Sequence, residues 1–409
     1  MKTSVADVSH DRAALGPQMW IPCIAMAACS WLAFVDRQVL AVLSPTILKE
    51  TGLSAQDYGT AFSFFFYVYA AANLLWGSLL DYLGLRFGMV AAVAIWSVAS
   101  ASHGLMSGFW GFAFARGLLG LGEGATFPGG LRAAVESLPS NRRARGIATS
   151  FSGGTLGAII TGPIAIPIAL TFGWRIAFLL SGLLGLAWIL LWLVVGRPPY
   201  LPKSENKPKK ITWPNPLERR FWALVFSYAL TCVAPGPILT IIPLYLSRGP
   251  LRVSQADLSS IIWMPPLAWG IGYFLWGWVA DRFAADNRRP VGLFVLLMLL
   301  ALAFGFTTWT NSLMVAMFLI SWGAFIGGGF QMVALKVGSY SFPREQAAMM
   351  SGIASGSFAL LNAILSPRLG QLLDQQHYAA MFWTIALCPV VGVVVWWLLS
   401  RRQEVGAIK

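Results

Sequence analysis

The sequence has few charged residues, few cysteines and few histidines. Only 11% of its 409 residues are Asp, Glu, Lys or Arg, whereas a typical soluble domain has about 25%. This composition excludes an ordinary soluble globular protein. The four cysteines all lie in apolar stretches without metal-ligand spacing. A zinc cluster and a disulfide framework are therefore excluded, and we interpret the cysteines as small core residues.

Motifs for nucleotide hydrolysis and metal-dependent catalysis are also absent. The sequence contains no Gly-x4-Gly-Lys-Ser/Thr loop, so ATP is not expected to drive the protein directly. It has no His-Glu-x-x-His and no paired His or Cys at metal-ligand spacing, which a membrane-embedded enzyme of that kind would need. We therefore expect that the protein is not an enzyme and has no metal site or cofactor.

Long apolar runs dominate what is present. The chain is 57% hydrophobic, with a mean hydropathy of +0.67, and many runs reach the roughly 20 residues that cross a ~30 Å hydrocarbon layer. The sequence therefore predicts an all-α integral membrane protein in the lipid bilayer. Twelve transmembrane helices are expected, at 18–47, 56–83, 86–107, 109–137, 143–171, 174–196, 218–247, 255–284, 289–309, 312–340, 345–374 and 377–400.

The basic residues are distributed unevenly between the predicted loops. The net charge is +13, and most Lys and Arg fall on the side that carries both termini and the middle loop. The opposite side has only Lys49, Arg175, Arg248 and Arg252. Loops rich in Lys and Arg stay in the cytoplasm, so we expect both termini to be cytoplasmic and the protein to be in the cell inner membrane. The basicity reflects this topology, and no nucleic-acid partner is expected.

The two halves of the chain repeat each other. The segment 74–86, "LLWGSLLDYLGLR", aligns with "FLWGWVADRFAAD" 200 residues later, and Arg132 matches Lys336 at an offset of 204. A parallel repeat of two six-span halves is the organisation of major facilitator transporters, whose binding site lies between the halves. The predicted parts are a tail 1–17, a first half 18–196, a linker 197–217, a second half 218–402 and a tail 403–409.

A loop motif supports this resemblance to the major facilitator superfamily. The segment "GSLLDYLGLR" resembles the superfamily signature Gly-x-x-x-Asp-(Arg/Lys)-x-Gly-Arg-(Arg/Lys), although Tyr82 replaces a base. An Asp at this helix end can pair with loop arginines in only one of two conformations and so act as a latch, or the arginines can be simple membrane anchors. The expected gating residues are Gly77, Asp81 and Arg86 in the first copy and Gly277, Asp281 and Arg282 in the second.

Four further segments resemble one family within that superfamily, the anion:cation symporters. They are "FVDRQVL", "RGLLGLGEGATFPGG", "RARGIATSFSGGTLGAIITGP" and "FGWRIAFLLSGLLGLAWILLWLVVGRPP". The likeness is closest to hexuronate carriers and covers nearly the whole first half. It implies proton-coupling roles for Asp36 and Glu123, and substrate-carboxylate roles for Arg37 and Arg116.

The four charges within predicted spans are also chemically suited to that work. Asp36 and Arg37 lie on the first span, and Arg116 and Glu123 lie two turns apart on one face of the fourth. Either they form a structural network of buried pairs, or the acids take up protons and free the arginines to hold an anion. In the second case proton and anion binding are reciprocally coupled, with Arg37 as the counter-ion of Asp36 until substrate arrives.

Neutral polar residues complete the predicted site. Tyr69 and Asn73 share a face of the second span at i, i+4 spacing, and Tyr69 matches a tyrosine near the family's substrate. Tyr228, Gln331 and Asn362 lie within spans of the second half. Gln331 and Asn362 either bind the polyol end of a sugar acid or join neighbouring helices.

Several secondary expectations concern helix ends and breaks. Arg132 and Lys336 lie near cytoplasmic helix ends and are expected to extend their charges to the interface. Arg132 can also form an i, i+4 pair with Glu136. The Pro-Gly-Pro of residues 235–237 breaks backbone hydrogen bonds, so span 7 is either a gating helix or simply kinked.

Together these features predict a proton-coupled symporter of a small organic anion, such as a hexuronate or aldonate. Transport would occur by alternating access, as the two halves rock around a central site, and the expected protein is a monomer. A carrier of an aromatic or dicarboxylic acid remains an alternative. A drug/proton antiporter is a weaker one, because Arg37 and Arg116 disfavour apolar or cationic substrates.

Overall fold

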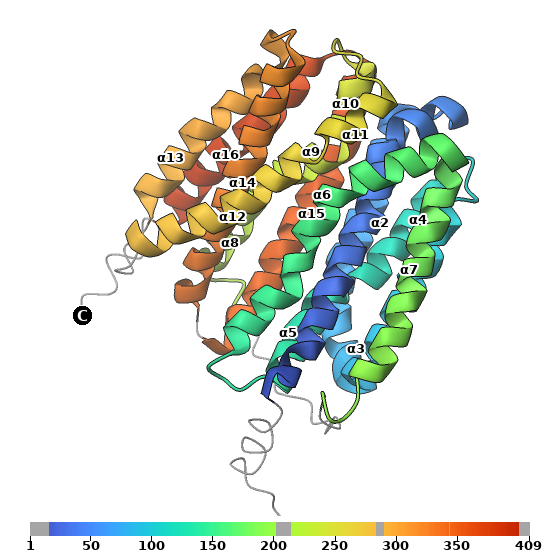
Figure 1. Cartoon of the computed structure of the whole chain (residues 1–409). Helices are drawn as coiled ribbons and strands as arrows, with labels where there is room; N and C mark the ends of the chain where they lie inside the picture. Colours follow the sequence, from blue (N-terminus) through green and yellow to red (C-terminus); the bar gives the residue numbers. More distant parts are fainter. Residues whose placement is uncertain (1–15, 202–213, 284–289, 343, 401–409) are drawn as a thin grey trace, which may run out of the picture.

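The computed structural model describes residues 16–201, 214–283, 290–342 and 344–400, and every regular element in these ranges is a helix. Figure 1 shows the helices of the two sequence halves as two neighbouring groups. The first group comprises η1 (Gly16–Trp20), α2 (Ile21–Thr51), α3 (Ala55–His103), α4 (Phe109–Glu123), α5 (Thr126–Ser137), α6 (Arg143–Phe172) and α7 (Trp174–Val195).

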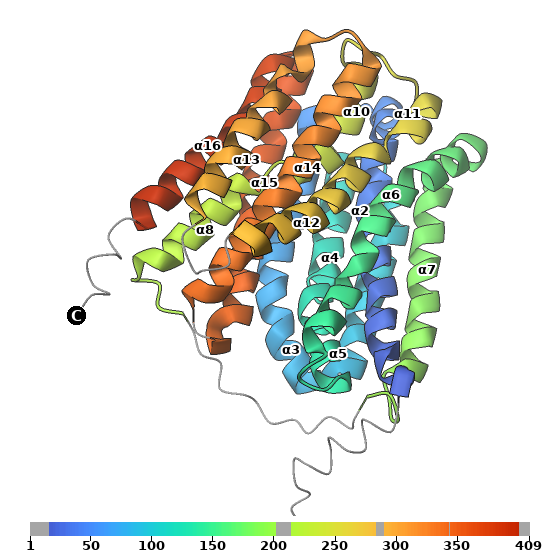
Figure 2. The same ribbon diagram turned by 60° about the vertical axis from the view of Figure 1, so that its left-hand side comes forward.

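The second group repeats this arrangement with shorter pieces. It comprises α8 (Arg219–Thr231), α9 (Pro235–Thr240), α10 (Ile242–Arg248), α11 (Gln255–Ile261), α12 (Met264–Phe283), α13 (Val291–Ala301), η2 (Leu302–Trp309), α14 (Leu313–Ser341), α15 (Arg344–Asp374) and α16 (Tyr378–Ser400). The view in Figure 2 shows α12 and α14 crossing at the front of this group. The predicted linker and tails lie largely outside the described residues.

The helices cover all twelve predicted spans, although two spans share one helix and others are divided into shorter helices. Within the described ranges, nine helices are long and apolar enough to cross a membrane. One of them, α3, is 49 residues long and contains both the second and third spans. The fourth span is divided into α4 and α5, and the eleventh, α15, is long but less apolar. The predicted all-α, two-half, twelve-helix fold is therefore confirmed.

Gly84 makes the turn inside α3. Its backbone has φ +75° and ψ +155°, which is not helical. Side chains with a Cβ rarely adopt a positive φ, whereas glycine does so without steric cost. The chain can therefore reverse between the second and third spans at the place where the sequence predicts a loop.

Two helix breaks lie in the middle of the bundle. The fourth span stops at Glu123 and restarts at Thr126, and the seventh stops at Thr231 and restarts at Pro235. Around the first break, a Cβ at Gly120 would collide with the backbone of α3 at Phe65. Glycine therefore lets α4 approach the backbone of α3 closely. This approach positions Glu123 and the start of the break.

The halves are joined where α15 ends against the start of α3. The carboxylate of Asp374 accepts hydrogen bonds from the backbone N–H groups of Ala55 (2.9 Å) and Gln56 (2.8 Å). These N–H groups belong to the first turn of α3, where a helix lacks internal partners and favours negative charge. An acid of the second half therefore caps a helix of the first.

Close backbone packing extends this seam. A Cβ at Gly59 would collide with the carbonyl of Ser366, and one at Gly370 would collide with that of Ala55. The Ser63 hydroxyl donates to the Ala363 carbonyl at 2.5 Å. Farther along α3, shortly before the turn at Gly84, a Cβ on Gly77 would meet no atom within 4 Å. The close glycine contacts between α3 and α15 therefore lie near the start of α3 and the end of α15, at the end of the bundle away from the termini.

We expect Asp374→Ala to loosen the first turn of α3. The N–H groups of Ala55 and Gln56 lose their acceptors, and a hydrogen bond to a charged group contributes roughly 1.5–3 kcal/mol. Hydrogen exchange of a peptide containing both residues should accelerate roughly tenfold or more. Asp257→Ala is the control, because Asp257 caps its own helix through Ser254. Equal exchange in wild type and Asp374→Ala would contradict the cap.

Candidate functional site

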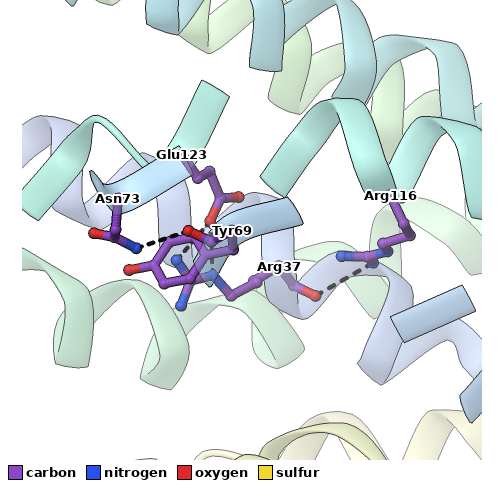
Figure 3. Close-up of polar contacts among 5 residues, drawn as sticks. All are labelled: Arg37, Tyr69, Asn73, Arg116 and Glu123. Atoms are coloured by element: carbon purple, nitrogen blue, oxygen red, sulfur yellow. Dashed lines mark hydrogen bonds and ion pairs between the residues drawn. The ribbon is translucent and has the colours of Figure 1, made fainter. Parts of the chain in front are cut away.

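Arg37 of α2 and Glu123 of α4 form a buried ion pair. The Nη2 and Nε atoms of Arg37 lie 2.6 and 2.7 Å from Oε2 of Glu123. The Glu123 side chain is fully buried, whereas 19% of the Arg37 side chain is exposed. Figure 3 shows Glu123 and Tyr69 gathered around the Arg37 side chain. Arg37 is therefore the member of the pair that a ligand can reach.

Aromatic rings surround the Arg37 guanidinium. Its central carbon lies 4.9 Å from the ring centre of Phe34, 5.0 Å from that of Phe65 and 4.9 Å from that of Tyr69. A cation near a ring face is attracted by the π electrons, and the rings exclude water from it. This environment strengthens any charge interaction at Arg37.

Asp36 points to a different part of the first half. Its Oδ1 accepts a hydrogen bond from Ser100 of α3 at 2.6 Å, and the Ser100 hydroxyl lies 2.8 Å from that of Ser181 on α7. The expectation that Arg37 is the counter-ion of Asp36 is therefore wrong for this structure. Successive residues of a helix project about 100° apart, so Asp36 and Arg37 face different neighbours.

Arg116 is the most enclosed of the four charges. It is fully buried, and its guanidinium lies 4.4 Å from the ring centre of Phe62. Its Nη2 donates a long hydrogen bond of 3.4 Å to the Arg37 carbonyl (Figure 3). Its Nε and Nη1 have no hydrogen-bond partner in the described part of the chain. The predicted four-charge cluster therefore contains one direct ion pair and two more separate buried charges.

The second half contributes neutral groups. Tyr228 of α8 is buried. Gln331 of α14 accepts a hydrogen bond of 2.8 Å from the indole of Trp269. The two halves thus meet around Arg37 with positive charge on one side and aromatic and amide groups on the other.

The two asparagines are held by their own helices. Asn73 donates to the Tyr69 carbonyl at 3.0 Å, as the predicted i, i+4 spacing allows, and Asn362 donates to the Phe358 carbonyl at 2.9 Å. A Cβ at Gly236 would collide with the side-chain oxygen of Asn362. Asn362 therefore packs against the break in the seventh span, which favours its role in joining helices.

The sequence matches the family model of the Major Facilitator Superfamily over residues 26–367. The chain belongs to the Major Facilitator Superfamily. Members of this superfamily are transporters, so the protein is a multi-pass membrane transporter and not an enzyme.

Several relatives of this superfamily member are sugar-acid transporters. The hexuronate transporter of Escherichia coli K12 is 24% identical over 91% of each chain. The D-galactonate transporter of Escherichia coli O6:H1 is 26% identical and covers 96% of this chain and 98% of its own. These relatives are of the kind that the motif resemblance implies.

A solved structure has the same fold. A bacterial homologue of the human lysosomal transporter Spinster superimposes with a TM-score of 0.78, covering 94% of this chain and 98% of its own. It was solved in an inward-facing, unoccupied conformation. Its sequence is only 18% identical, so the likeness extends to the fold alone.

The superfamily loop motif forms a matching ion pair in each half. Arg132 pairs with Asp81 at 2.9 Å and also with Glu136, while Lys336 pairs with Asp281 at 3.0 Å. The predicted i, i+4 pair of Arg132 with Glu136 is confirmed, and the extension of Arg132 and Lys336 toward the membrane interface stays a prediction. The basic partners of the two aspartates lie on α5 and α14. Helix packing holds these two helices beside the aspartates.

The remaining motif residues have other neighbours. Arg86 donates to the Leu193 carbonyl at 2.9 Å and so fastens the turn to α7. Arg282 lies exposed at the end of α12. A Cβ at Gly277 would meet only Met332, at 3.7 Å or more. Two loop arginines between α12 and α13, residues 288 and 289, lie outside the described residues.

Sequence reasoning overlooked several residues of the site. Phe34 precedes Arg37 by three positions and could have been found from helical spacing. Ser100 and Ser181 could not, because isolated serines are common in apolar spans and nothing in their spacing connects them with Asp36. Trp269 also gave no signal, since its partner Gln331 is 62 residues away.

We expect a double-mutant cycle to show which of the two acids, Glu123 or Asp36, is the partner of Arg37. Arg37→Leu and Glu123→Leu should each destabilise the protein, and the double variant should recover part of the loss, with a coupling energy on the order of 1–3 kcal/mol. The measurement is unfolding of the purified transporter in detergent. The cycle of Arg37→Leu with Asp36→Leu should give a clearly smaller coupling. Equal couplings would contradict the assigned partners.

Proposed function

We propose that the protein is a proton-coupled symporter of a small organic anion, with sugar acids such as hexuronates and aldonates as substrates. The Arg37–Glu123 pair is the observation that carries this proposal. It combines a fully buried acid with a base whose side chain is 19% exposed. The hexuronate and galactonate transporters among the relatives support the choice of substrate.

Charge neutrality explains how the pair couples two ligands. With Glu123 ionised, the pair has no net charge and Arg37 is occupied. A proton on Glu123 leaves Arg37 uncompensated, because arginine retains its own proton. Arg37 can then hold a substrate carboxylate through two parallel hydrogen bonds. Proton and anion therefore increase each other's affinity by the same factor.

Asp36 and Arg116 act as a second, more enclosed part of the coupling. Protonation of Asp36 would increase the net positive charge beside the site, because Arg116 remains charged. Arg116 is fully buried in this conformation, so we assign it an electrostatic role here and reserve direct contact with the substrate for Arg37. Tyr69, Tyr228, Gln331 and Asn73 complete the lining.

Transport follows from rocking of the two halves. The seam between α3 and α15 closes the end away from the termini, and we place that end at the periplasm, with both termini in the cytoplasm of a cell that carries the protein in its inner membrane. Opening this end requires release of the Asp374 cap. The Asp81 and Asp281 pairs hold the helix ends of each half as it moves. We propose a monomer as the working unit.

We expect Arg37→Gln to weaken binding of D-galactonate and D-glucuronate at least 30-fold, because an uncharged amide cannot replace the fork that holds a carboxylate. Binding is measured by calorimetry on purified protein. Arg368→Gln is the control, since Arg368 is exposed and donates a hydrogen bond to the nearby Gln371 side chain. Unchanged affinity in Arg37→Gln would contradict the proposal that Arg37 binds the substrate carboxylate.

A screen of sugar acids, aromatic acids, dicarboxylates and cationic drugs tests the substrate class. Wild type should be stabilised against heat by sugar acids more than by the others, since ligands that bind the folded state raise its melting temperature. Stabilisation by aromatic or dicarboxylic acids alone would move the proposal to those substrates. Stabilisation by cationic drugs alone would overturn the anion carrier.

We expect Glu123→Gln to separate exchange from accumulation. The amide imitates the protonated acid, so anion binding and counterflow in liposomes should persist, with affinity that no longer improves as the pH falls. Accumulation driven by a pH gradient should be lost, because the residue cannot release a proton. Full accumulation by this variant would leave Glu123 as a structural partner of Arg37 and place the coupling on Asp36.

A further inference from the structure

Trp269 connects the two halves beside Arg37. It lies on α12, in the second half, and its ring centre is 5.9 Å from that of Phe34 in the first half. Phe34 in turn supports the Arg37 guanidinium at 4.9 Å. Neither the sequence motifs nor the family resemblance assigns any role to Trp269. The contacts place its indole at the edge of the space that a bound anion would occupy.

The indole also fixes the orientation of an amide. Trp269 Nε1 lies 2.8 Å from Gln331 Oε1. An indole N–H can only donate, so the carbonyl oxygen of the amide must face it, and the NH2 group must point away. The opposite amide orientation would set two donors against each other. This bond therefore removes the usual ambiguity between the oxygen and nitrogen of a glutamine side chain.

The Gln331 nitrogen is left available for a ligand. The side chain is 5% exposed, and its hydrogen bonds within the described chain consist of the one with Trp269. Its nitrogen is not among the fully enclosed side-chain atoms without a partner in the described chain, so a small part of its surface is accessible. A buried amide with two unused donors favours a ligand that can accept hydrogen bonds.

We propose that Trp269 is a positioning residue that presents the Gln331 NH2 group to the oxygen-rich end of the transported anion. This inference rests on the proposed function and narrows its substrate class. Arg37 holds the carboxylate, and Gln331 selects a molecule that carries a hydroxyl, carbonyl or second carboxylate oxygen farther along. A hydrocarbon tail in the same place would leave the Gln331 donors without a partner, which disfavours simple fatty carboxylates.

The matched test uses two tryptophans of α12. Trp269→Phe removes the indole donor and keeps an aromatic ring. Trp276→Phe is the control, because Trp276 is equally buried on the same helix and its Nε1 has no partner among the described residues. Calorimetry with D-galactonate and D-glucuronate should show a roughly three- to tenfold loss of affinity in Trp269→Phe, the effect expected for one hydrogen bond. The control should match wild type.

Two further measurements distinguish positioning from simple packing. In a Gln331→Leu background, Trp269→Phe should cause no additional loss of affinity for D-galactonate, because the residue acts through the amide. Inhibition of D-galactonate uptake by hexanoate, which has no hydroxyl groups, should be equal in wild type and Trp269→Phe. Trp269 would be assigned to packing if Trp269→Phe lowered the affinity for D-galactonate as much in the Gln331→Leu background as in wild type. It would also be assigned to packing if Trp269→Phe weakened inhibition by hexanoate as much as it weakens binding of D-galactonate. Either result would overturn the inference.

The outcomes also separate this inference from the proposed function. Wild type that binds sugar acids, together with a Trp269→Phe variant indistinguishable from Trp276→Phe, would overturn the positioning role alone. Wild type that binds neither D-galactonate nor D-glucuronate would overturn the sugar-acid function and this inference with it.

Discussion

The arrangement of the first half depends on one ion pair that is enclosed in an apolar bundle. Glu123 is fully buried and 19% of the Arg37 side chain is exposed, and removing either partner would leave a charge without compensation in a low-dielectric environment. The pair requires α4 to lie close to α2 and α3 at the level of its break. Gly120 allows that approach because a Cβ there would collide with α3. The aromatic rings around Arg37 then exclude water from the pair.

The two halves share their architecture but differ in chemistry. Each half has an aspartate paired with a base on its fourth span, Asp81 with Arg132 and Asp281 with Lys336. In the centre the symmetry is lost. The first half provides charged groups, while the second provides Tyr228, Trp269 and Gln331. In the proposed function, this division assigns the response to protons to the first half and the recognition of neutral parts of a ligand to the second.

The contact between halves combines strong and reversible elements. The Asp374 carboxylate caps the start of α3 through two backbone N–H groups, and glycines permit close packing on either side. Water can replace the hydrogen bonds of an exposed cap at modest net cost. A seam of this kind holds one conformation and can still open, which is consistent with a transporter whose halves move relative to each other.

The sequence by itself determined the span positions, the two halves and the types of group available at the centre. These features are local: apolar length, charge bias between loops and motif spacing are all properties of short segments. The turn at Gly84 and the break that precedes Pro235 were also predictable, because glycine and proline act on the backbone around them.

Only the tertiary structure decided which groups are partners. Asp36 and Arg37 are adjacent in the chain, yet helix geometry directs them to Ser100 and Glu123, which come from different helices. Asp81 and Arg132 are 51 residues apart, and Trp269 and Gln331 are 62 apart. Such pairs depend on the rotation and depth of packed helices. These are set by many contacts at once, and no short segment of sequence encodes them.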